Sequence, residues 1–442
     1  MAGKLMFNIR FDKTMRDVQW SFISLAVSSI AHLLLRITLG KELGPSGLGL
    51  YTLIFTIYMF GIQFAAFGIE TALTKYIAEY KEDSLKINKY ISSGLFASFF
   101  SGLIFGFSIY ILSTTISINL FHNSNMIPLL QITAICFPFI AIQKAVQGVL
   151  NGFRSMKYFA YLNVCQNTLI VVSSVFLVLS LKMGVEGAIV GLVIPTIVMG
   201  ILSLYYVKGN FVFHLGLLKG VFKDLSSFGF YVVLANSLGV INTQIDSLMI
   251  GYFMSETDVG YYAIAAIFMQ GVILIPSAVQ RITTPAIATY YGKKDYYSIE
   301  KTIKSTMLKT FELTLLISFC IAIFGKFIII FLFKDFLPAY TPMLILLTGY
   351  TVYSVLISVG GALSSVGAVK ITFKISLICT FINALLNVLL IPQYGLIGAS
   401  IATSISLIVT SAFQLYFIKR YVLKNKSWKV SHKDSSFTTP YS

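Results

Sequence analysis

The sequence predicts an all-α polytopic membrane protein with twelve transmembrane helices, arranged as two parallel six-helix repeats. Three observations predict this fold: a series of long apolar segments, connecting loops that alternate between rich and poor in Lys and Arg, and an internal repeat at a constant offset. The composition agrees, because 57% of the 442 residues are hydrophobic, 11% are charged and the mean hydropathy is +0.83. A helix needs about 20 residues to cross a bilayer core of ~30 Å. Lipid offers no hydrogen bonds to backbone N–H and C=O groups, so a spanning segment must satisfy them internally, as a helix does.

The apolar segments justify the helices in order. The first begins at Trp20 after a polar, basic stretch, and no small-residue cleavage site follows it, so we expect a retained helix rather than a removed signal peptide. The stretch from Glu70 to Lys89 mixes charged and apolar residues and predicts an interfacial helix between the second and third spans. The predicted spans are 20–39, 48–68, 90–112, 128–148, 159–181, 185–207, 225–250, 260–280, 308–333, 342–365, 371–391 and 396–418.

The distribution of basic residues predicts the orientation, since Lys and Arg gather in cytoplasmic loops. If both termini are cytoplasmic, only five of the 33 basic residues lie elsewhere: Arg36, Lys41, Lys182, Lys326 and Lys334. The expected division of the chain is a cytoplasmic N-terminus, an N-terminal six-helix lobe, a cytoplasmic linker, a C-terminal six-helix lobe and a basic cytoplasmic tail. Their ranges are 1–19, 20–207, 208–224, 225–418 and 419–442.

The remaining composition excludes several classes of function. The net charge of +16 sits at helix ends, where it sets topology, so no nucleic-acid partner is inferred. The four histidines are scattered and the four cysteines fall within predicted spans without metal-ligand spacing, so we expect no metal site. The loops are short and hold no cluster of acids and bases, and no Gly-rich phosphate loop is present. We therefore expect neither an enzyme nor a bound cofactor.

The two halves are copies at a shift of 211 residues. The last helix of each half begins with a similar five-residue sequence, which starts at Gly184 in the first half and at Gly395 in the second. Six helices per half is an even number, so the repeats share one orientation, which is an architecture of transporters that hold a substrate between two halves. The matching pairs are Gly40 with Gly251, Gly49 with Gly260, Tyr51 with Tyr262, Gly184 with Gly395, Gly187 with Gly398 and Ala188 with Ala399.

Three stretches resemble one family. They are the junction from Arg36 to Tyr51, its counterpart in residues 246–251 and 259–265, and the segment from Ile391 to Ala399. Together they are similar to oligosaccharide flippases, the polysaccharide-transporter branch of the multidrug/oligosaccharidyl-lipid/polysaccharide exporter superfamily. The resemblance implies two lobes around a central cavity and transport of a polyprenyl-linked or dolichyl-linked sugar. Peptidoglycan-precursor flippases of the superfamily usually carry two further helices, for which this chain has no room.

Charged residues inside the spans are candidates for substrate binding or gating, because such charges are costly in a membrane. Arg36 and Asp246 are expected at similar depth near the outer face, and Glu70 and Arg281 at the inner ends of symmetry-related helices. We predict that Arg36 with Asp246 forms an outer gate and Glu70 with Arg281 an inner one. The arginines also suit phosphate capture. The alternative is that these groups meet headgroups or snorkel to the interface.

Polar helix faces add a second set of candidates. Asn242 and Thr243 share a face with Asp246, while Asn163, Gln166 and Asn167 share one on the fifth span. Either face is expected to contact sugar hydroxyls or to hydrogen-bond between helices.

Several lysines border the predicted inner mouth, and they either attract an anionic headgroup or serve only as topology signals. Lys326 is expected to snorkel. The mouth residues are Lys144, Lys157, Lys370 and Lys374.

The predicted function is a flippase that moves a lipid-linked oligosaccharide from the cytoplasmic to the outer leaflet by alternating access. The alternatives are a cation-coupled multidrug or metabolite exporter of the same superfamily and, from another class, a membrane enzyme of glycan assembly. The exporters usually carry an acidic residue in the first helix. The first segment here has no Asp or Glu, and its only ionisable side chains are the basic ones of His32 and Arg36. Asp246, Glu70 and Glu312 are candidates for a coupling cation, H⁺ or Na⁺. The expected partners are membrane lipids and the glycan substrate, with the protein acting as a monomer in the cell membrane.

Overall fold

The computed structural model describes residues 13–210 and 218–423. Within them the chain is helical and forms no strand. The predicted N-terminus 1–19, linker 208–224 and tail 419–442 therefore lie partly outside the described residues.

The helices follow one another with short connections. The elements up to residue 210 are α1 (Lys13–Ala66), α2 (Ile69–Glu79), α3 (Ser84–Thr115), η1 (Ile116–Leu120), α4 (Met126–Ala134), α5 (Phe137–Gly152), α6 (Met156–Leu179), α7 (Gly184–Ser203) and η2 (Leu204–Asn210). The later ones are α8 (Leu218–Phe253), α9 (Glu256–Gly292), α10 (Tyr296–Leu332), η4 (Lys334–Ala339), α11 (Tyr340–Val359), α12 (Ala362–Ser365), α13 (Val369–Ile418) and η5 (Lys419–Leu423).

The described part of the chain is long and apolar enough for twelve membrane crossings. Nine helices are long and apolar enough to span, and α4 with α5, bent by 44° at a short break, makes a tenth span. Two of the ten, α1 with 54 residues and α13 with 50, are more than twice the ~20 residues that one crossing needs. Each therefore supplies two spans, which confirms the predicted fold class.

A glycine divides each of these two long helices. Gly44 has φ 67° and ψ −174°, and Gly395 has φ 56° and ψ −133°. Positive φ is accessible to glycine at no steric cost, so the chain turns there without a loop. The internal repeat reappears in the backbone, because Gly184, the partner of Gly395 at the 211-residue shift, also has a positive φ of 60°.

The chain forms two compact units, and their boundary differs from the predicted linker. The N-terminal unit comprises residues 1–241 and 255–260, and the C-terminal unit comprises 242–254 and 261–442. The boundary falls inside α8 because the first part of this helix packs on the N-terminal unit. Tyr90 of α3 donates a hydrogen bond of 3.2 Å to Asp224, and Gly229 lies against the backbone at Phe67 and Gly68.

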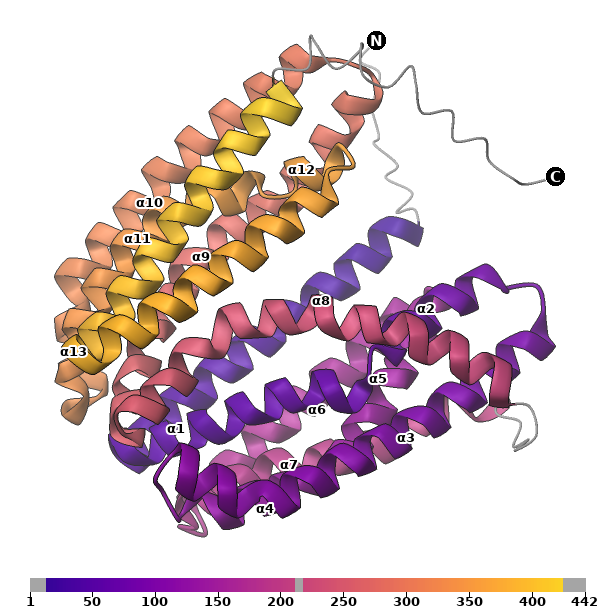
Figure 1. The fold of residues 1–442 in the computed structure, drawn as a ribbon, viewed down its shortest axis with the longest axis horizontal. Helices are drawn as coiled ribbons and strands as arrows, with labels where there is room; N and C mark the ends of the chain where they lie inside the picture. Colours follow the sequence, from indigo (N-terminus) through magenta and orange to yellow (C-terminus); the bar gives the residue numbers. More distant parts are fainter. Residues whose placement is uncertain (1–12, 211–217, 424–442) are drawn as a thin grey trace, which may run out of the picture. The chain divides into compact units, whose positions relative to one another are not determined.

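In the N-terminal unit, α1 packs on α6, α6 on α7, and α5 on α2 and α3 (Figure 1). Helix α2 lies in the stretch predicted as an interfacial helix. Its buried residues Ile69, Leu73 and Ile77 join a core with Val146 and Val149 of α5. A half-apolar helix of this kind is anchored by one face only.

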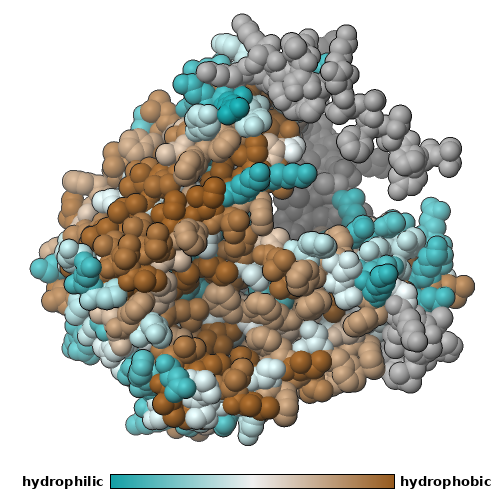
Figure 2. All heavy atoms as spheres, viewed as in Figure 1, coloured by the Kyte–Doolittle hydropathy of each residue, from teal (hydrophilic) through white to brown (hydrophobic). Residues whose placement is uncertain are grey.

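In the C-terminal unit, α11 packs against both α10 and α13 (Figure 1). Figure 2 shows hydrophobic side chains along these helices, with hydrophilic ones gathered toward the ends. Most of the α10 surface is apolar yet exposed, for example Phe319 and Phe331. Such a surface is stable when its solvent is lipid.

Candidate functional site

Arg36 ends a polar stripe on α1. Ser28, His32 and Arg36 follow one another at intervals of four residues, so they lie on one helix face. Arg36 is half-buried, and the phenol of Tyr51 lies close enough to interact with it electrostatically. Arg36 takes part in none of the ion pairs that join described residues. Its positive charge is therefore suited to an incoming anion.

Helix α6 holds the stripe in place. Asn167 Nδ2 donates a hydrogen bond of 2.8 Å to Ser28 Oγ, and the Asn167 side chain also hydrogen-bonds His32. On its other side the His32 ring lies 5.7 Å from the ring of Phe55. These contacts restrict the rotamers of the residues next to Arg36 and so reduce the entropy cost of binding an anion there.

The rest of the polar face on α6 pairs with α5. Gln143 Nε2 donates to Gln166 Oε1 at 2.9 Å, and Gln147 Nε2 donates to Asn163 Oδ1 at 3.1 Å. Both glutamines of α5 are almost wholly buried, at 0% and 1% exposure. The sequence predicts that Asn163, Gln166 and Asn167 either contact sugar hydroxyls or hydrogen-bond between helices. In the structure all three make interhelical hydrogen bonds.

Asp246 is the centre of a polar cluster inside the C-terminal unit. Its Oδ2 accepts hydrogen bonds from Tyr262 Oη at 2.8 Å and from Thr403 Oγ1 at 2.6 Å, and its Oδ1 accepts one from Asn387 Nδ2 at 2.7 Å. Asn387 Nδ2 also donates to Asn383 Oδ1 at 3.2 Å. Helices α8 and α9 and both halves of α13 thus converge on one carboxylate, which explains how this charge is tolerated inside a bundle.

The chemistry of the Asp246 cluster suits a small hard cation or a proton. All its candidate ligands are oxygens, and Asn387 Oδ1 is buried without a hydrogen-bond partner among described residues. Oxygen donors are the ligands that hard cations prefer. No group of three or more His, Cys, Asp and Glu that could hold a metal occurs in residues 13–210 and 218–423. A single carboxylate therefore matches the charge of a monovalent cation.

The two other predicted residues on this part of α8 have different surroundings. Asn242 donates to Ser376 Oγ at 3.0 Å and accepts from Thr380 Oγ1 at 2.5 Å, although its side chain remains exposed. Thr243 is exposed as well. Both belong to the same unit as the Asp246 cluster, and the hydrogen bonds of Asn242 go to residues of α13 outside that cluster.

Glu70 is in contact with one of the lysines predicted to attract headgroups. Its carboxylate lies 3.5 Å from Lys144 Nζ, within the N-terminal unit, and both side chains are about 30% exposed. Arg281, its predicted gate partner, is an exposed residue of α9 in the C-terminal unit.

The remaining charged candidates are exposed on the surface of their helices. Lys157 lies on α6, Lys370 and Lys374 lie at the start of α13, and Lys326 and Glu312 lie on α10. Exposure is compatible with an attraction of headgroups or with a simple topology signal.

The sequence reasoning missed most partners of Asp246. The sequence pattern marks Tyr262 as the counterpart of Tyr51 but not as a partner of Asp246, and it assigns no role to Thr403, Asn383 or Asn387. One signal was available, since Asn383 and Asn387 are four residues apart in an otherwise apolar span and must share a face. The convergence with Thr403 depends on the fold of α13 back upon itself and has no local signal.

Comparisons with known proteins agree with this architecture. The family model for polysaccharide biosynthesis proteins matches residues 14–291, and the MatE model matches residues 232–389. A probable low-salt glycan biosynthesis flippase, Agl15 of Haloferax volcanii, is 24% identical over 86% of this chain and 78% of its own length. A putative O-antigen transporter of Shigella flexneri is 21% identical over 88% of this chain and 94% of its own.

The fold also has a counterpart among solved structures. The lipid II flippase MurJ, in an inward closed conformation, superposes with a TM-score of 0.73 over 91% of this chain and 87% of its own, at 19% identity. At this low identity it is the superposition that shows a common fold. The match of the polysaccharide biosynthesis model extends over more than half of the sequence. The chain therefore belongs to the polysaccharide biosynthesis protein family, the oligosaccharide flippases of the multidrug/oligosaccharidyl-lipid/polysaccharide exporter superfamily.

Proposed function

We propose that this protein is a flippase that moves a lipid-linked oligosaccharide from the cytoplasmic to the outer leaflet of the cell membrane. The observation that carries the proposal is Arg36, a half-buried guanidinium on a spanning helix that joins no ion pair among the described residues. Membership of the family supports it, as do relatives named as a glycan biosynthesis flippase and an O-antigen transporter. The protein is a transporter rather than an enzyme.

The physical task is to replace water around a phosphate and a sugar. Carrying such a headgroup through hydrocarbon unaided costs many kcal/mol, because its charges and hydroxyls lose their hydrogen bonds. Arg36 supplies a planar fork of donors that matches phosphate oxygens. A polyprenyl or dolichyl tail stays in the bilayer while a central cavity that opens alternately to each side shelters the headgroup.

A cation couples the cycle through the Asp246 cluster. Binding of H⁺ or Na⁺ neutralises a carboxylate that otherwise needs three hydrogen bonds, so it changes the packing of α8 against α13. This is the feature that favours the second candidate, a cation-coupled multidrug or metabolite exporter, together with the MatE match over residues 232–389. The absence of an acidic residue from 20–39 weighs against that candidate.

The charged pairs Arg36 with Asp246 and Glu70 with Arg281 act as outer and inner gates in this proposal. Opposite charges at matched depths in symmetry-related helices support the idea: Arg281 is the repeat counterpart of Glu70, and Asp246 is the counterpart of Leu35, the neighbour of Arg36. Charge reversal tests the inner pair, since Glu70→Arg and Arg281→Glu should each impair transport and the double variant should recover part of it. Normal transport by both single variants would refute the inner gate.

The proposal also includes the topology and the oligomeric state. The distribution of Lys and Arg supports cytoplasmic termini, and the protein works as a monomer.

The function can be tested with purified protein in sealed vesicles that contain a lipid-linked oligosaccharide. A glycosidase added outside measures how much substrate becomes accessible with time. We expect Arg36→Gln to slow translocation about tenfold or more, the factor that ~1.4 kcal/mol gives. Lys326→Gln, which removes another intramembrane cation at an exposed site on α10, is the matched control and should behave like the wild type.

Two results would overturn the proposal. One is a wild-type protein that leaves the oligosaccharide inaccessible while exporting cationic dyes, which would establish the exporter instead. The other is sugar transfer by the purified protein, which would identify an enzyme of glycan assembly. Lipid that co-purifies with the protein, identified by mass spectrometry, would name the carrier.

A further inference from the structure

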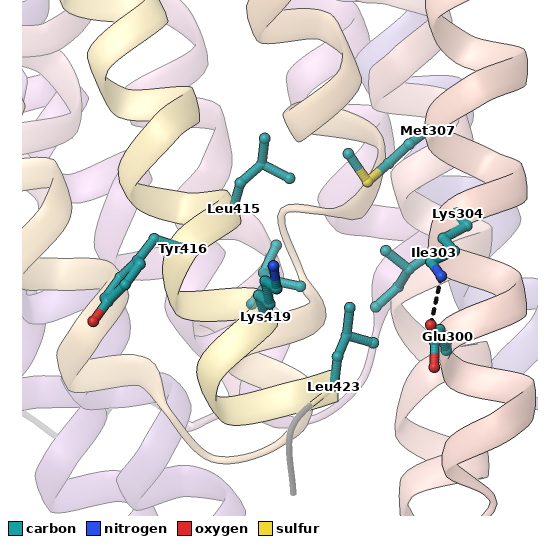
Figure 3. Close-up of a pocket in the computed structure, with 9 residues that line it drawn as sticks. Glu300, Ile303, Lys304, Met307, Leu415, Tyr416, Lys419 and Leu423 are labelled. Atoms are coloured by element: carbon teal, nitrogen blue, oxygen red, sulfur yellow. Dashed lines mark ion pairs between the residues drawn. The ribbon is translucent and has the colours of Figure 1, made fainter.

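A cavity of about 530 Å³ opens at one end of the C-terminal unit, where α10 begins and α13 ends (Figure 3). Its volume lies within the range of ~300–1,000 Å³ that is usual for sites of small ligands. It contains none of the residues discussed above, so neither the gate pairs nor the Asp246 cluster accounts for it.

The lining changes from charged to apolar along the helices. On α10, Glu300 and Lys304 come first, and Met307 lies ~10 Å further into the span than Glu300 at ~1.5 Å per residue. On α13, which runs the opposite way, Leu415 precedes Lys419 by about one turn. On both walls the charged residue therefore lies nearer the helix end than Met307 or Leu415, with Leu423 following Lys419 at the end of η5. This order matches the boundary between lipid headgroups and acyl chains.

The charged residues that line the cavity have a net charge of about +1. Lys304 Nζ lies 2.6 Å from a carboxylate oxygen of Glu300, so this pair is neutral. Lys419, on the facing wall in Figure 3, joins no ion pair among the described residues. It begins η5, a single π-helical turn, and such turns are frequent at functional sites. One phosphodiester would make the site neutral, whereas a zwitterionic lipid would leave the positive charge uncompensated.

We propose that this cavity binds the headgroup of an anionic membrane phospholipid. The phosphate lies between Lys419 and Lys304, and the upper part of an acyl chain runs along Ile303, Met307 and Leu415. Glu300 keeps Lys304 extended along its helix and excludes a second negative charge. The site holds the end of α13 to the start of α10 through lipid, and it does not depend on the transported substrate.

The experiment measures lipid retention by native mass spectrometry on the full chain in detergent. Phosphatidylglycerol and phosphatidylcholine with identical acyl chains are added in equal amounts. The wild type should retain phosphatidylglycerol preferentially, and Lys419→Gln should weaken this retention about fivefold, the factor that ~1 kcal/mol for one Lys gives. The control is Lys309→Gln, which removes the same charge from an exposed position of α10 outside the cavity.

A second arm distinguishes a lipid from a free anion. Inorganic phosphate should not displace phosphatidylglycerol, because the apolar wall contributes to lipid binding, and Met307→Trp, which fills that wall, should weaken retention even though no charge changes. Equal retention of the two lipids, or equal effects of Lys419→Gln and Lys309→Gln, would overturn the proposal. Displacement by phosphate would replace the lipid with a soluble anion as the ligand.

Discussion

The amine of Lys144 lies 3.5 Å from the carboxylate of Glu70, and this ion pair joins α5 to the start of α2. Glu70 is therefore partnered within the N-terminal unit, whatever role it has with Arg281. Because both side chains are about 30% exposed, water screens the pair, and a contribution of about 0.2–1 kcal/mol is expected.

Exchanging these two charges separates the structural role of Glu70 from its role in gating. Glu70→Lys or Lys144→Glu alone should lower the thermal unfolding midpoint, and the double variant should recover it because the ion pair reforms with opposite polarity. If Glu70 also meets Arg281, the double variant should still transport poorly, since a lysine would then face an arginine. Full transport by the stable double variant would leave Glu70 with the structural role alone.

The fold was predictable because hydropathy, loop charge and an internal repeat are each properties of a sequence window. They identify the two crossings on either side of Gly44 and the two on either side of Gly395. The structure has no loop at either place, because one glycine with a positive φ divides each long helix. The unit boundary was not predictable in the same way. It depends on contacts between distant residues, such as Tyr90 with Asp224, that no local pattern contains.

The candidate site was predictable only in part, for the same reason. An isolated charge in an apolar span stands out, so Arg36 and Asp246 were found. The neutral partners of Asp246 do not stand out, because Thr and Asn occur throughout such spans as ordinary hydrogen-bonding groups. Tyr262 and Thr403 acquire their role only when α9 and α13 meet.

Asp246→Asn should abolish the dependence of transport on a cation gradient. The amide is nearly the same shape but carries no charge, and it cannot accept hydrogen bonds at both positions from Tyr262, Thr403 and Asn387. The measurement is flipping in vesicles with and without an imposed H⁺ or Na⁺ gradient. Asp335→Asn is the control, because this carboxylate is exposed in η4 of the same unit and is not a candidate for coupling, and its gradient dependence should remain. An unchanged gradient response in Asp246→Asn would exclude Asp246 as the coupling group.

The pair formed by Gln143 and Gln166 should show coupling in a double-mutant cycle. Gln143→Leu removes the donor and leaves Gln166 Oε1 without its 2.9 Å hydrogen bond, so we expect a loss of about 1 kcal/mol in the free energy of unfolding. The double variant Gln143→Leu with Gln166→Leu should be more stable than the two single losses predict, since no polar group is then left unpaired. Additive losses in denaturant unfolding would show that the two amides act independently.

Two aspartates give a prediction for pH. Asp83 and Asp295 are the N-caps of α3 and α10, where they accept hydrogen bonds of 3.0 Å from the backbone N–H of Lys86 and Ser298. The pKa of Asp83 is lowered chiefly by its backbone hydrogen bond from Lys86, and that of Asp295 by its hydrogen bonds from Ser298. A carboxylate with a lowered pKa stabilises the folded state above its unfolded pKa, and the stabilisation is lost as the pH falls through the folded value.

The unfolding midpoint of the wild type should therefore exceed that of Asp295→Asn at neutral pH. The difference should shrink as the pH falls below 3.8, the ordinary value for this group. Asparagine keeps the cap but does not titrate, so it isolates the contribution of charge. Asp295→Ala removes the cap as well and should be less stable than Asp295→Asn at every pH. A difference between wild type and Asp295→Asn that does not change with pH would refute the assignment.

Gly49 should be intolerant of any side chain because two backbones meet there. A Cβ at Gly49 would clash with the carbonyl oxygen of Glu256, and one at Gly260 would clash with that of Pro45. The two glycines of the repeat therefore allow α1 and the start of α9 to touch within the N-terminal unit. Gly49→Ala must push these helices apart and should reduce the amount of folded protein recovered in detergent as well as transport. Gly271→Ala, in the same α9 but with open space around it, is the matched control and should be tolerated or slightly stabilising. If Gly49→Ala and Gly271→Ala gave the same yield and the same elution profile on size exclusion, the close approach of the two backbones would not be a requirement of the fold.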